Sequence, residues 1–419
     1  MPHRARLLCL TVLAAVLAGG CAHVPGQKQM LSDLTDEIGR TYAPDKRTAL
    51  WETLVQKQGG ELILTGLTDW PEALEALRTA AAREDLDARI DVRLLPDASV
   101  SEKPWALVSV PAASLTGKPA FAAALTTQAV LGTPLRVLER QRPFTRVQTP
   151  DGYIGWVHDL QIVRLTQEKL AERNTAKRVI VPRGPMLLLD EKGSALMPVP
   201  AAAELVELGR EKGRVRVLLP DGCTGTLASD QVVPTEAFEK HWDALRRGPE
   251  AVYAQAFVEM ARAFLGTPYL WGGTSQAGLD CSGFVSLARR LTGLIVSRDA
   301  DQQLAQARPY KFDRIEDVPP GLLFGFGKKL VDGKLRVDHI AVSLGGGDFI
   351  HSLGSVRIES LSEASPLYSA YEAGRFLGVW ELPASLTGVP CATTLSSNPF
   401  YAAKPGALEP CRAPAVLDQ

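Results

Sequence analysis

Apolar residues recur along this chain at two different spacings, and the change of spacing marks out its first segments. Short apolar and alternating runs predict three strands, at 48–57, 60–69 and 88–97. Between the second and third strands, residues 70–84 carry apolar positions at helical spacing, with Pro71 in the first turn. Residues 45–100 are therefore expected to form a small β-β-α-β unit. The preceding stretch 22–44 is expected to be a polar linker with helical character over 27–40.

A sequence repeat follows this unit. Residues 146–163, RVQTPDGYIGWVHDLQIV, align with residues 216–233, RVLLPDGCTGTLASDQVV, at a constant offset of 70. In both copies a β-rich run enters a Pro-Asp-Gly turn, which supplies the φ values of a tight turn, and continues as a second short strand. We therefore expect two small β-barrels, at 101–168 and 169–238.

Two aromatic side chains distinguish the copies. Tyr153 and Trp156 of the first copy are replaced by Cys223 and Thr226 in the second. Aromatic residues on a barrel usually pack, and we expect this of Trp156. A phenol also has a polar tip, so Tyr153 is a candidate to contact a ligand at a domain junction. The second barrel is expected to be a scaffold.

The third pattern is a pair of helices around a loop rich in glycine. Apolar residues recur at helical spacing from Val252 to Phe264, and after the loop the segment CSGFVSLARRL begins a second amphipathic helix at Cys281. A free cysteine is commonly a buried core residue. At a helix N-terminus, however, a thiol faces unpaired N–H groups and the positive end of the dipole, and both predict a lowered pKa.

A cysteine nucleophile also needs a base to accept its proton. His339 and His351 are the histidines downstream of Cys281, and the segment VDHIAVSLGGGDFIHSLG reads as a hairpin that places them on neighbouring strands. There, His351 can hydrogen-bond to one nitrogen of His339 and leave the other for the thiol. The small residues Ser282 and Gly283 would let a substrate carbonyl reach backbone N–H groups that stabilise an oxyanion.

The overall composition narrows the function classes. A chain of 419 residues is too long for one ordinary core, so several domains are expected. The 46 Lys and Arg residues balance 47 Asp and Glu residues, which excludes the basic footprint of a nucleic-acid-binding protein. No C-x-x-C or H-x-x-x-H spacing occurs, so a metal site is not expected.

The first 21 residues have the features of a secretory signal. Arg4 and Arg6 precede an apolar run over 7–17 that is too short to span a membrane. The ending LAGGC resembles a bacterial lipoprotein signal, which implies a lipid on Cys21 and an anchor in the cell envelope. In a cell with two membranes, Ala22 after this cysteine resembles the sorting signal that directs a lipoprotein to the outer membrane. The alternative is an ordinary cleaved signal in which Cys21 is incidental.

Export also bears on the C-terminal tail, residues 386–419. Cys391 and Cys411 could pair in an exported protein. Outside that possible loop, the composition of the tail favours disorder.

Three sequence blocks resemble, in order and spacing, the NlpC-type cell-wall cysteine peptidases. These blocks, within 245–385, are GTPYLWGGTSQAGLDCSGF, SRDADQQ and DHIAVSLGGGDFIHS. The resemblance implies a papain-like fold, cleavage of peptidoglycan stem peptides, and no cofactor. It also implies that Cys281 is the nucleophile, His339 the base and His351 the third, polar member.

The other segments have resemblances of their own. Residues 45–100 resemble the BON-type domain of exported bacterial proteins, and the DGYIGWV copy resembles a bacterial SH3 domain. The expected fold class is therefore multidomain α+β, with a BON-like segment and two SH3-like barrels before the papain-like domain. This architecture resembles the branch of the family that hydrolyses the bond between γ-D-glutamate and a diamino acid.

That branch prefers stem peptides with a free N-terminal L-alanine. In it, the acid before the nucleophile, the serine after it and a tyrosine from the first SH3 domain surround the ammonium group. The resemblance gives these substrate-binding roles to Asp280, Ser282 and Tyr153. A buried ammonium does need a carboxylate and further acceptors to offset its desolvation.

Arg298 has two interpretations. It could bind a substrate carboxylate, or form a structural ion pair with Asp299 or Asp301.

The whole chain also has alternatives to the endopeptidase. One is an amidase or acyltransferase that uses the same Cys-His groups on cell-wall substrates. The other is a non-catalytic wall-binding lipoprotein. Among the remaining residues, Tyr269 and Trp271 are expected either to wall the cleft or to pack. His158 and His241 have no partner pattern and are expected to lie on the surface or to pack.

Overall fold

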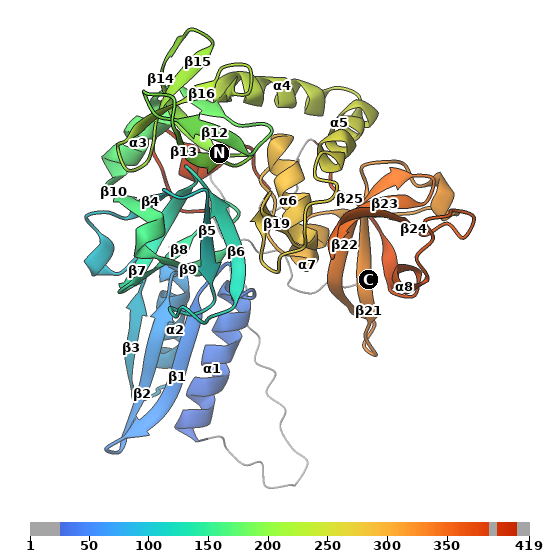
Figure 1. Cartoon of the computed structure of the whole chain (residues 1–419). Helices are drawn as coiled ribbons and strands as arrows, with labels where there is room; N and C mark the ends of the chain where they lie inside the picture. The colour runs from blue at the N-terminus through green and yellow to red at the C-terminus, as the bar shows by residue number, and fades with distance from the viewer. Residues whose placement is uncertain (1–25, 385–391, 409–419) are drawn as a thin grey trace, which may run out of the picture.

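The computed structural model describes residues 26–384 and 392–408, which fold into four units in chain order (Figure 1). The mixed α+β class predicted from the sequence is confirmed. Among the residues described, no helix is both long and apolar enough to cross a lipid bilayer.

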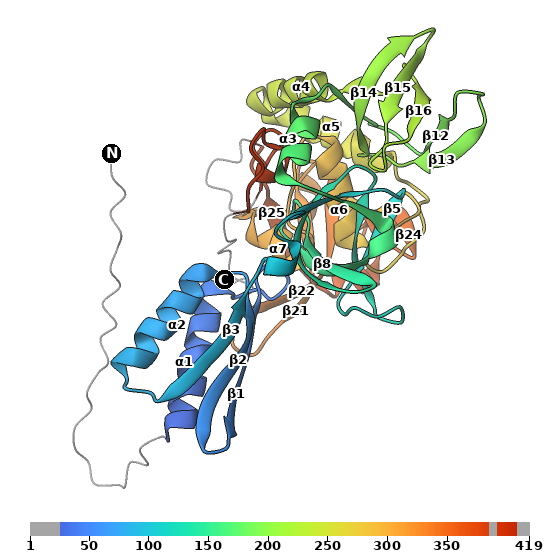
Figure 2. The same ribbon diagram turned by 90° about the vertical axis from the view of Figure 1, so that its left-hand side faces the viewer.

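The N-terminal unit is a three-stranded sheet with two helices on one face (Figure 2). Strand β2 pairs antiparallel with β1 and parallel with β3. Helix α1 confirms the helical character expected over 27–40. The expected linker is wrong there, because Leu31 and Ile38 of α1 are buried in the core of this unit. Its elements are α1 (Gln27–Tyr42), β1 (Trp51–Gln58), β2 (Glu61–Thr68), α2 (Pro71–Arg83) and β3 (Ala88–Leu94).

The first sheet unit has seven strands in the order β10-β4-β7-β8-β9-β5-β6. The Pro-Asp-Gly turn of the repeat lies between β8 and β9. Two short 3-10 helices, η1 (Ala98–Val100) and η2 (Asp159–Gln161), flank the sheet. The strands are β4 (Trp105–Val108), β5 (Ala112–Thr116), β6 (Leu125–Val130), β7 (Pro134–Gln141), β8 (Phe144–Gln148), β9 (Ile154–His158) and β10 (Ile162–Leu165).

The second sheet unit has the same topology. Its order, β17-β11-β14-β15-β16-β12-β13, matches that of the first unit strand for strand, so the sequence repeat corresponds to a structural repeat. Helix α3 (Gln167–Thr175) connects the two units. The strands are β11 (Arg178–Ile180), β12 (Met186–Leu189), β13 (Ala195–Val199), β14 (Glu204–Glu211), β15 (Arg214–Leu218), β16 (Thr224–Ala228) and β17 (Val233–Pro234).

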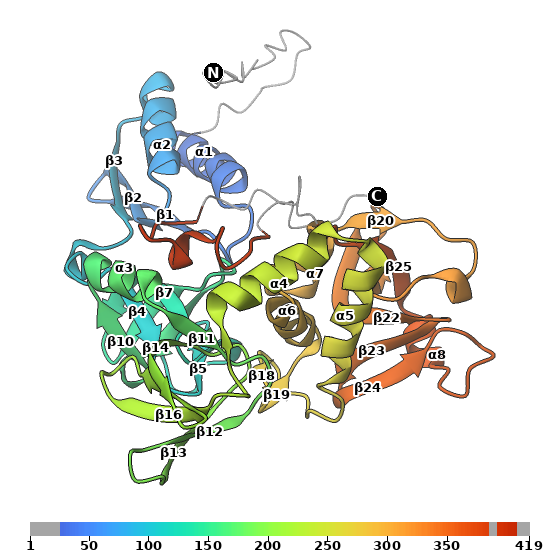
Figure 3. The ribbon, with the colours of Figure 1, turned by 90° about the horizontal axis from the view of Figure 1, so that it is seen from above.

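The fourth unit places helices against a six-stranded antiparallel sheet in the order β20-β25-β21-β22-β23-β24. Helix α6 packs against β22 with an apolar face of Phe284, Val285, Ala288 and Leu291, and α4 and α5 lie beside it (Figure 3). Its helices are α4 (Thr235–Arg247), α5 (Glu250–Arg262), α6 (Cys281–Leu291), η3 (Ile315–Asp317), α7 (Ala300–Ala305) and α8 (Ala370–Ala373). Its strands are β18 (Thr274–Ser275), β19 (Gly278–Leu279), β20 (Arg308–Tyr310), β21 (Leu323–Lys329), β22 (Leu335–Gly345), β23 (Asp348–Leu353), β24 (Ser355–Ser360) and β25 (Phe376–Glu381).

Residues 392–408, which we call the strap, run back over the other units and include η4 (Pro399–Tyr401) (Figure 3). The Asn398 side chain donates to the Pro150 carbonyl at 2.8 Å, and the buried Phe400 ring packs edge-on against Trp105. The sequence predicts disorder only outside the possible 391–411 loop, so the strap, which lies inside it, does not test that prediction. The aromatic side chains of the strap are buried against the first sheet unit and α6. Cys391 and Cys411 lie outside the described residues.

Candidate active site

Cys281 is the first residue of α6, and its neighbours fix the start of that helix. The Asp280 carboxylate caps it by accepting the Gly283 N–H at 2.7 Å and also accepts the Gly272 N–H at 2.9 Å. A Cβ atom on Gly283 would lie 2.0 Å from the Gly273 carbonyl oxygen, so only glycine allows this close approach of loop and helix. The thiol is therefore held in one position by backbone contacts on both sides.

The two histidines meet as the hairpin pattern predicts. Strands β22 and β23 are antiparallel, and Nε2 of His339 lies 2.8 Å from Nδ1 of His351. Both imidazoles are buried. Helix α6 packs against β22, and the backbone N–H of Ile340, next to His339, acts to lower the pKa of the Cys281 thiol, so the strand of His339 lies against the start of α6. Nδ1 of His339 is left as the nitrogen that can accept the thiol proton.

Burial sets the protonation of the Cys281 and His339 side chains at rest. Burial raises the pKa of the Cys281 thiol to about 12, and the neighbouring Asp280 charge acts in the same direction. Burial lowers the pKa of His339 to about 3. The lowered thiol pKa predicted from the helix N-terminus is therefore wrong, because loss of solvation outweighs the backbone N–H groups. Burial therefore favours the neutral form of both groups, so the proton is expected to move as the sulfur attacks.

Arg298 is a buried clamp on the residues around the nucleophile. Its guanidinium donates to both Asp280 carboxylate oxygens, at 3.0 and 2.6 Å. It also donates to the Ser282 hydroxyl at 2.8 Å and, from the first sheet unit, to the Thr127 hydroxyl at 2.9 Å. Of the two interpretations of Arg298, these contacts favour a structural ion pair over binding of a substrate carboxylate, because the guanidinium is buried and bonded to groups of the protein. The main partner is Asp280, with Asp299 at 3.9 Å.

Tyr153 lies between the first sheet unit and the fourth unit. The side chain is buried, and burial raises the pKa of its phenol. The Asp299 carboxylate raises that pKa further, while the charges of Arg298 and Arg47 act in the opposite direction. The phenol therefore lies among charged groups of other units, as expected of a residue at a domain junction.

The N-terminal unit contributes a charge that the sequence analysis did not identify. Arg47 forms ion pairs with Asp299 at 2.8 Å and with Asp301 and Asp45 at 2.7 Å. Gln302 of α7 donates to the same Asp45 at 2.7 Å. The N-terminal unit, the first sheet unit and the fourth unit thus meet beside Tyr153. No local pattern marks Arg47, since its partners at the start of α7 are 252 and 254 residues away in sequence.

The remaining candidates separate by exposure. Tyr269 is half-buried, and the charges of Cys281 and Asp280 add to burial in raising its pKa to about 12, so it borders the site. Trp271 is 69% exposed. Trp156 is buried beneath the Arg146 guanidinium and packs, as expected. His158 lies among aromatic rings of the first sheet unit, and His241 lies against Trp242.

One further set of polar atoms lies behind the imidazoles. Ligand-type atoms of His339, His351 and Glu372 lie within 4.8 Å of one another, a spacing that a metal ion could bridge. Nε2 of His339 and Nδ1 of His351 are already bonded to each other, and Glu372 pairs with Arg375 at 3.2 Å.

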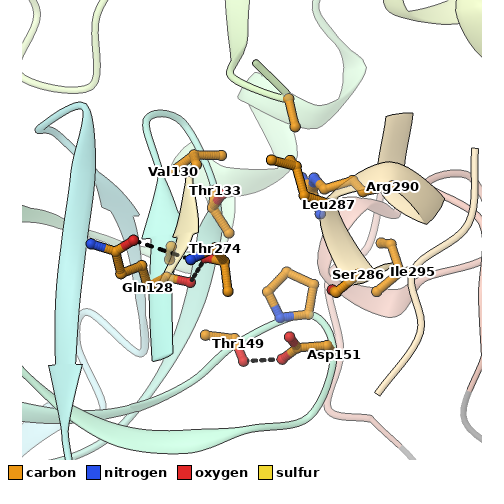
Figure 4. Close-up of a pocket in the computed structure, with 13 residues that line it drawn as sticks. Gln128, Val130, Thr133, Thr149, Asp151, Thr274, Ser286, Leu287, Arg290 and Ile295 are labelled. Atoms are coloured by element: carbon orange, nitrogen blue, oxygen red, sulfur yellow. Dashed lines mark hydrogen bonds between the residues drawn. The ribbon is translucent and has the colours of Figure 1, made fainter. Parts of the chain in front are cut away.

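Figure 4 shows a small cavity between the first sheet unit and α6. Gln128 and Asp151 line it from the first sheet unit, and Ser286 and Arg290 line it from α6, beyond the turn that carries Cys281. Its volume of about 60 Å³ is far below that of a peptide-binding pocket. It marks the join between the units and does not hold substrate.

Two families match this chain. The NlpC/P60 family model matches residues 266–380, which contain Cys281, His339 and His351. A model described as the bacterial dipeptidyl-peptidase SH3 domain matches residues 115–162, which contain Tyr153.

Two relatives match over most of their own length. Gamma-D-glutamyl-L-lysine dipeptidyl-peptidase of Bacillus cereus is 29% identical over 270 residues, 60% of this chain and 74% of the relative. The protein of that name from Bacillus subtilis is 27% identical over 54% of this chain and 72% of the relative. Residues 266–380 of this chain form an NlpC/P60 peptidase domain, and the chain is homologous to gamma-D-glutamyl-L-lysine dipeptidyl-peptidases.

Solved structures agree on the fold of this peptidase. A crystal structure of an NlpC/P60 family protein from Bacillus cereus superposes with a TM-score of 0.55 at 24% identity, covering 67% of the peptidase and 99% of that protein. An NlpC/P60 endopeptidase from Photobacterium damselae subsp. piscicida has a TM-score of 0.50 at 14% identity, covering 69% and 73% respectively.

Proposed function

We propose that this peptidase hydrolyses the γ-D-glutamyl bond to a diamino acid in peptidoglycan stem peptides and requires a free N-terminal L-alanine. The names of its two Bacillus relatives support the bond, since both are gamma-D-glutamyl-L-lysine dipeptidyl-peptidases. The observation that carries the proposal is the position of Tyr153. Its side chain is buried where the first sheet unit meets the fourth unit, and its phenol is close enough to Asp299 for that carboxylate to raise its pKa. A phenol oxygen and a carboxylate can both accept hydrogen bonds from an ammonium group, which a peptide has only at its N-terminus.

The ammonium site is proposed around Tyr153, Asp299, Asp280 and Ser282. Asp280 is occupied by two backbone N–H groups and Arg298, so it contributes charge and aligns Ser282. Asp299 has the freer carboxylate, because its side chain is 27% exposed, Arg47 bonds to one of its oxygens and Arg298 lies 3.9 Å from the other. Such a site excludes uncut wall, in which the alanine nitrogen is an amide without charge.

The reaction follows from the neutral resting pair. His339 takes the thiol proton as the Cys281 sulfur attacks the γ-glutamyl carbonyl carbon, and backbone N–H groups at the start of α6 hold the oxyanion. The His339 imidazolium then protonates the leaving amine, and the C–N bond breaks to leave a thioester. Water, deprotonated by His339, hydrolyses the thioester and restores the thiol.

The same proposal covers location. The lipoprotein-type signal supports export and a lipid anchor on Cys21, placing the peptidase in the cell envelope. Fractionation of cells that express the full chain tests this. The anchored protein should sediment with membranes, and a Cys21→Ser variant should not. Equal distribution of both proteins would remove the anchor from the proposal.

Cleavage of defined peptides tests the activity. Purified peptidase is incubated with L-Ala-γ-D-Glu-L-Lys, with the meso-diaminopimelate analogue and with the N-acetylated form of each. We expect release of L-Ala-γ-D-Glu from the free-amine peptides and loss of that release in Cys281→Ala. No cleavage of any peptide would reject the endopeptidase, whereas equal cleavage of free and acetylated forms would reject only the ammonium site.

A further inference from the structure

The outer nitrogen of His351 and one oxygen of Glu359 face each other in the interior. Nε2 of His351 lies 3.4 Å from Oε2 of Glu359. Both atoms are buried, and neither has a hydrogen-bond partner among the described residues. Two orphaned polar atoms of opposite character at this distance need only a small side-chain adjustment to bond.

The sheet explains why they meet. Strand β24 pairs with β23 so that His351 is opposite Arg357 and Phe349 is opposite Glu359. Residues two apart on a strand share a face, so Glu359 is the diagonal neighbour of His351. Arg357 bonds to the other Glu359 oxygen, Oε1, at 2.6 Å and leaves Oε2 as the free acceptor.

We propose that Glu359 is a positioning residue that keeps a proton on Nε2 of His351 and thereby selects the tautomer of His339 that can act as a base. With Nε2–H of His351 donated to Glu359, Nδ1 of His351 can only accept. It accepts the Nε2–H of His339, and this leaves Nδ1 of His339 unprotonated for the thiol. In the opposite arrangement, Nδ1–H of His351 donates to Nε2 of His339. The proton of His339 then lies on its own Nδ1, and this nitrogen cannot accept the thiol proton.

Other charged groups lie near His351 but cannot fill this role. His339 is the partner whose tautomer is being set, and Arg357 is a cation without an acceptor. Glu372 approaches from α8 and is paired with Arg375, which also bonds to Asp338. Glu359 is therefore the carboxylate with an unused oxygen directed at the imidazole.

This inference deepens the proposed reaction, and part of its test needs no substrate. Nitrogen-15 NMR of histidine-labelled Cys281→Ala peptidase at pH 7 reports which ring nitrogen carries each proton. We expect the proton of His351 on Nε2 and that of His339 also on Nε2. A His351 proton on Nδ1 would overturn the proposal whatever bond the enzyme cleaves.

Variants separate positioning from packing. Glu359→Gln keeps an acceptor oxygen, and Glu359→Leu keeps a similar volume without one. We expect kcat to fall about 10- to 100-fold in Glu359→Leu with KM unchanged, the usual effect of losing an orienting carboxylate, and to recover largely in Glu359→Gln. Glu363→Gln, at an exposed position nearby, is the matched control. If Glu359→Leu were as active as Glu359→Gln or more active, Glu359 would act through packing alone. If the leucine variant does not fold, the tautomer measurement decides.

Discussion

Arg298 and Asp280 form a buried ion pair with two parallel hydrogen bonds, and Asp280 is the residue directly before the nucleophile. The pair lies 18 residues apart in sequence and joins the start of α6 to the segment before α7. Through Thr127, the same guanidinium also reaches the first sheet unit. One side chain therefore aligns the helix cap, the serine beside the thiol and a neighbouring domain.

Removing Arg298 should unfold or loosen the site. Arg298→Ala leaves the Asp280 carboxylate buried without its cation, and breaking such a pair costs about 3–5 kcal/mol. Arg298→Lys should recover only part of this stability, because an ammonium cannot make the two parallel bonds. Denaturant unfolding measures the free energy. Wild-type stability of Arg298→Ala would contradict a structural clamp.

The hydroxyl of Tyr153 should matter for one class of peptide. Tyr153→Phe keeps the buried ring and removes the polar tip. We expect KM for the free-amine peptide to rise about 10-fold, as for loss of a hydrogen bond to a charged group, with residual cleavage of the N-acetylated peptide unchanged. Tyr371→Phe, whose side chain is 65% exposed, is the control. Equal losses on both peptides would mean that Tyr153 serves the fold and not the ammonium.

Arg47 should affect peptide binding although it lies in the N-terminal unit. Without it, the Asp299 and Asp301 carboxylates repel each other and Asp299 shifts. We expect Arg47→Ala to raise KM for the free-amine peptide about 5-fold, which corresponds to about 1 kcal/mol. Lys46→Ala, at the exposed neighbouring position, should have no effect. A lower KM in Arg47→Ala would instead mean that the guanidinium competes with the substrate ammonium.

Acid should destabilise the fold through the two imidazoles. Burial lowers the pKa of His339 to about 3 and that of His351 to about 2, from 6.5 in the unfolded chain. The unfolded state therefore binds more protons below pH 6.5, and stability is lost as pH falls from there toward 3. Unfolding free energies measured across this range should show the loss. His351→Gln should reduce its slope, and an unchanged slope would contradict this origin.

The strap should be needed for stability. Phe400→Ala removes a fully buried ring that packs against Trp105, and such truncations cost about 3–5 kcal/mol. Phe121→Ala, at a ring that is 81% exposed, is the matched control. Thermal unfolding of both variants compares the losses. Similar melting temperatures would show that the strap only rests on the surface.

Local patterns predicted local features well. The helix that begins at Cys281, the hairpin that pairs His339 with His351, and the sequence repeat all depend on spacing within a short stretch. Contacts between distant segments were missed or misassigned. The acids next to Arg298 suggest its partner, whereas its main partner, Asp280, is 18 residues away. Arg47 pairs with Asp299 across 252 residues, a separation that no local pattern indicates.

Protonation could not be inferred from the sequence either. A helix N-terminus predicts a lowered thiol pKa, but the opposite shift depends on how completely β22 and the loop before α6 cover the sulfur. The path of the strap could not be predicted either. Within the possible 391–411 loop, Leu395, Phe400 and Tyr401 are buried against apolar side chains of the folded units, and no pattern within the tail indicates those partners.

The strap also constrains when the peptidase can mature. Its residues are the last of the described chain to be synthesised, yet they bond to Pro150 of the first sheet unit, to Asn174 of α3 and to Ile295 after α6. Those contacts cannot form until residues 392–408 have been synthesised. The strap therefore joins the first sheet unit, α3 and the segment after α6 only after the rest of the described chain has been made.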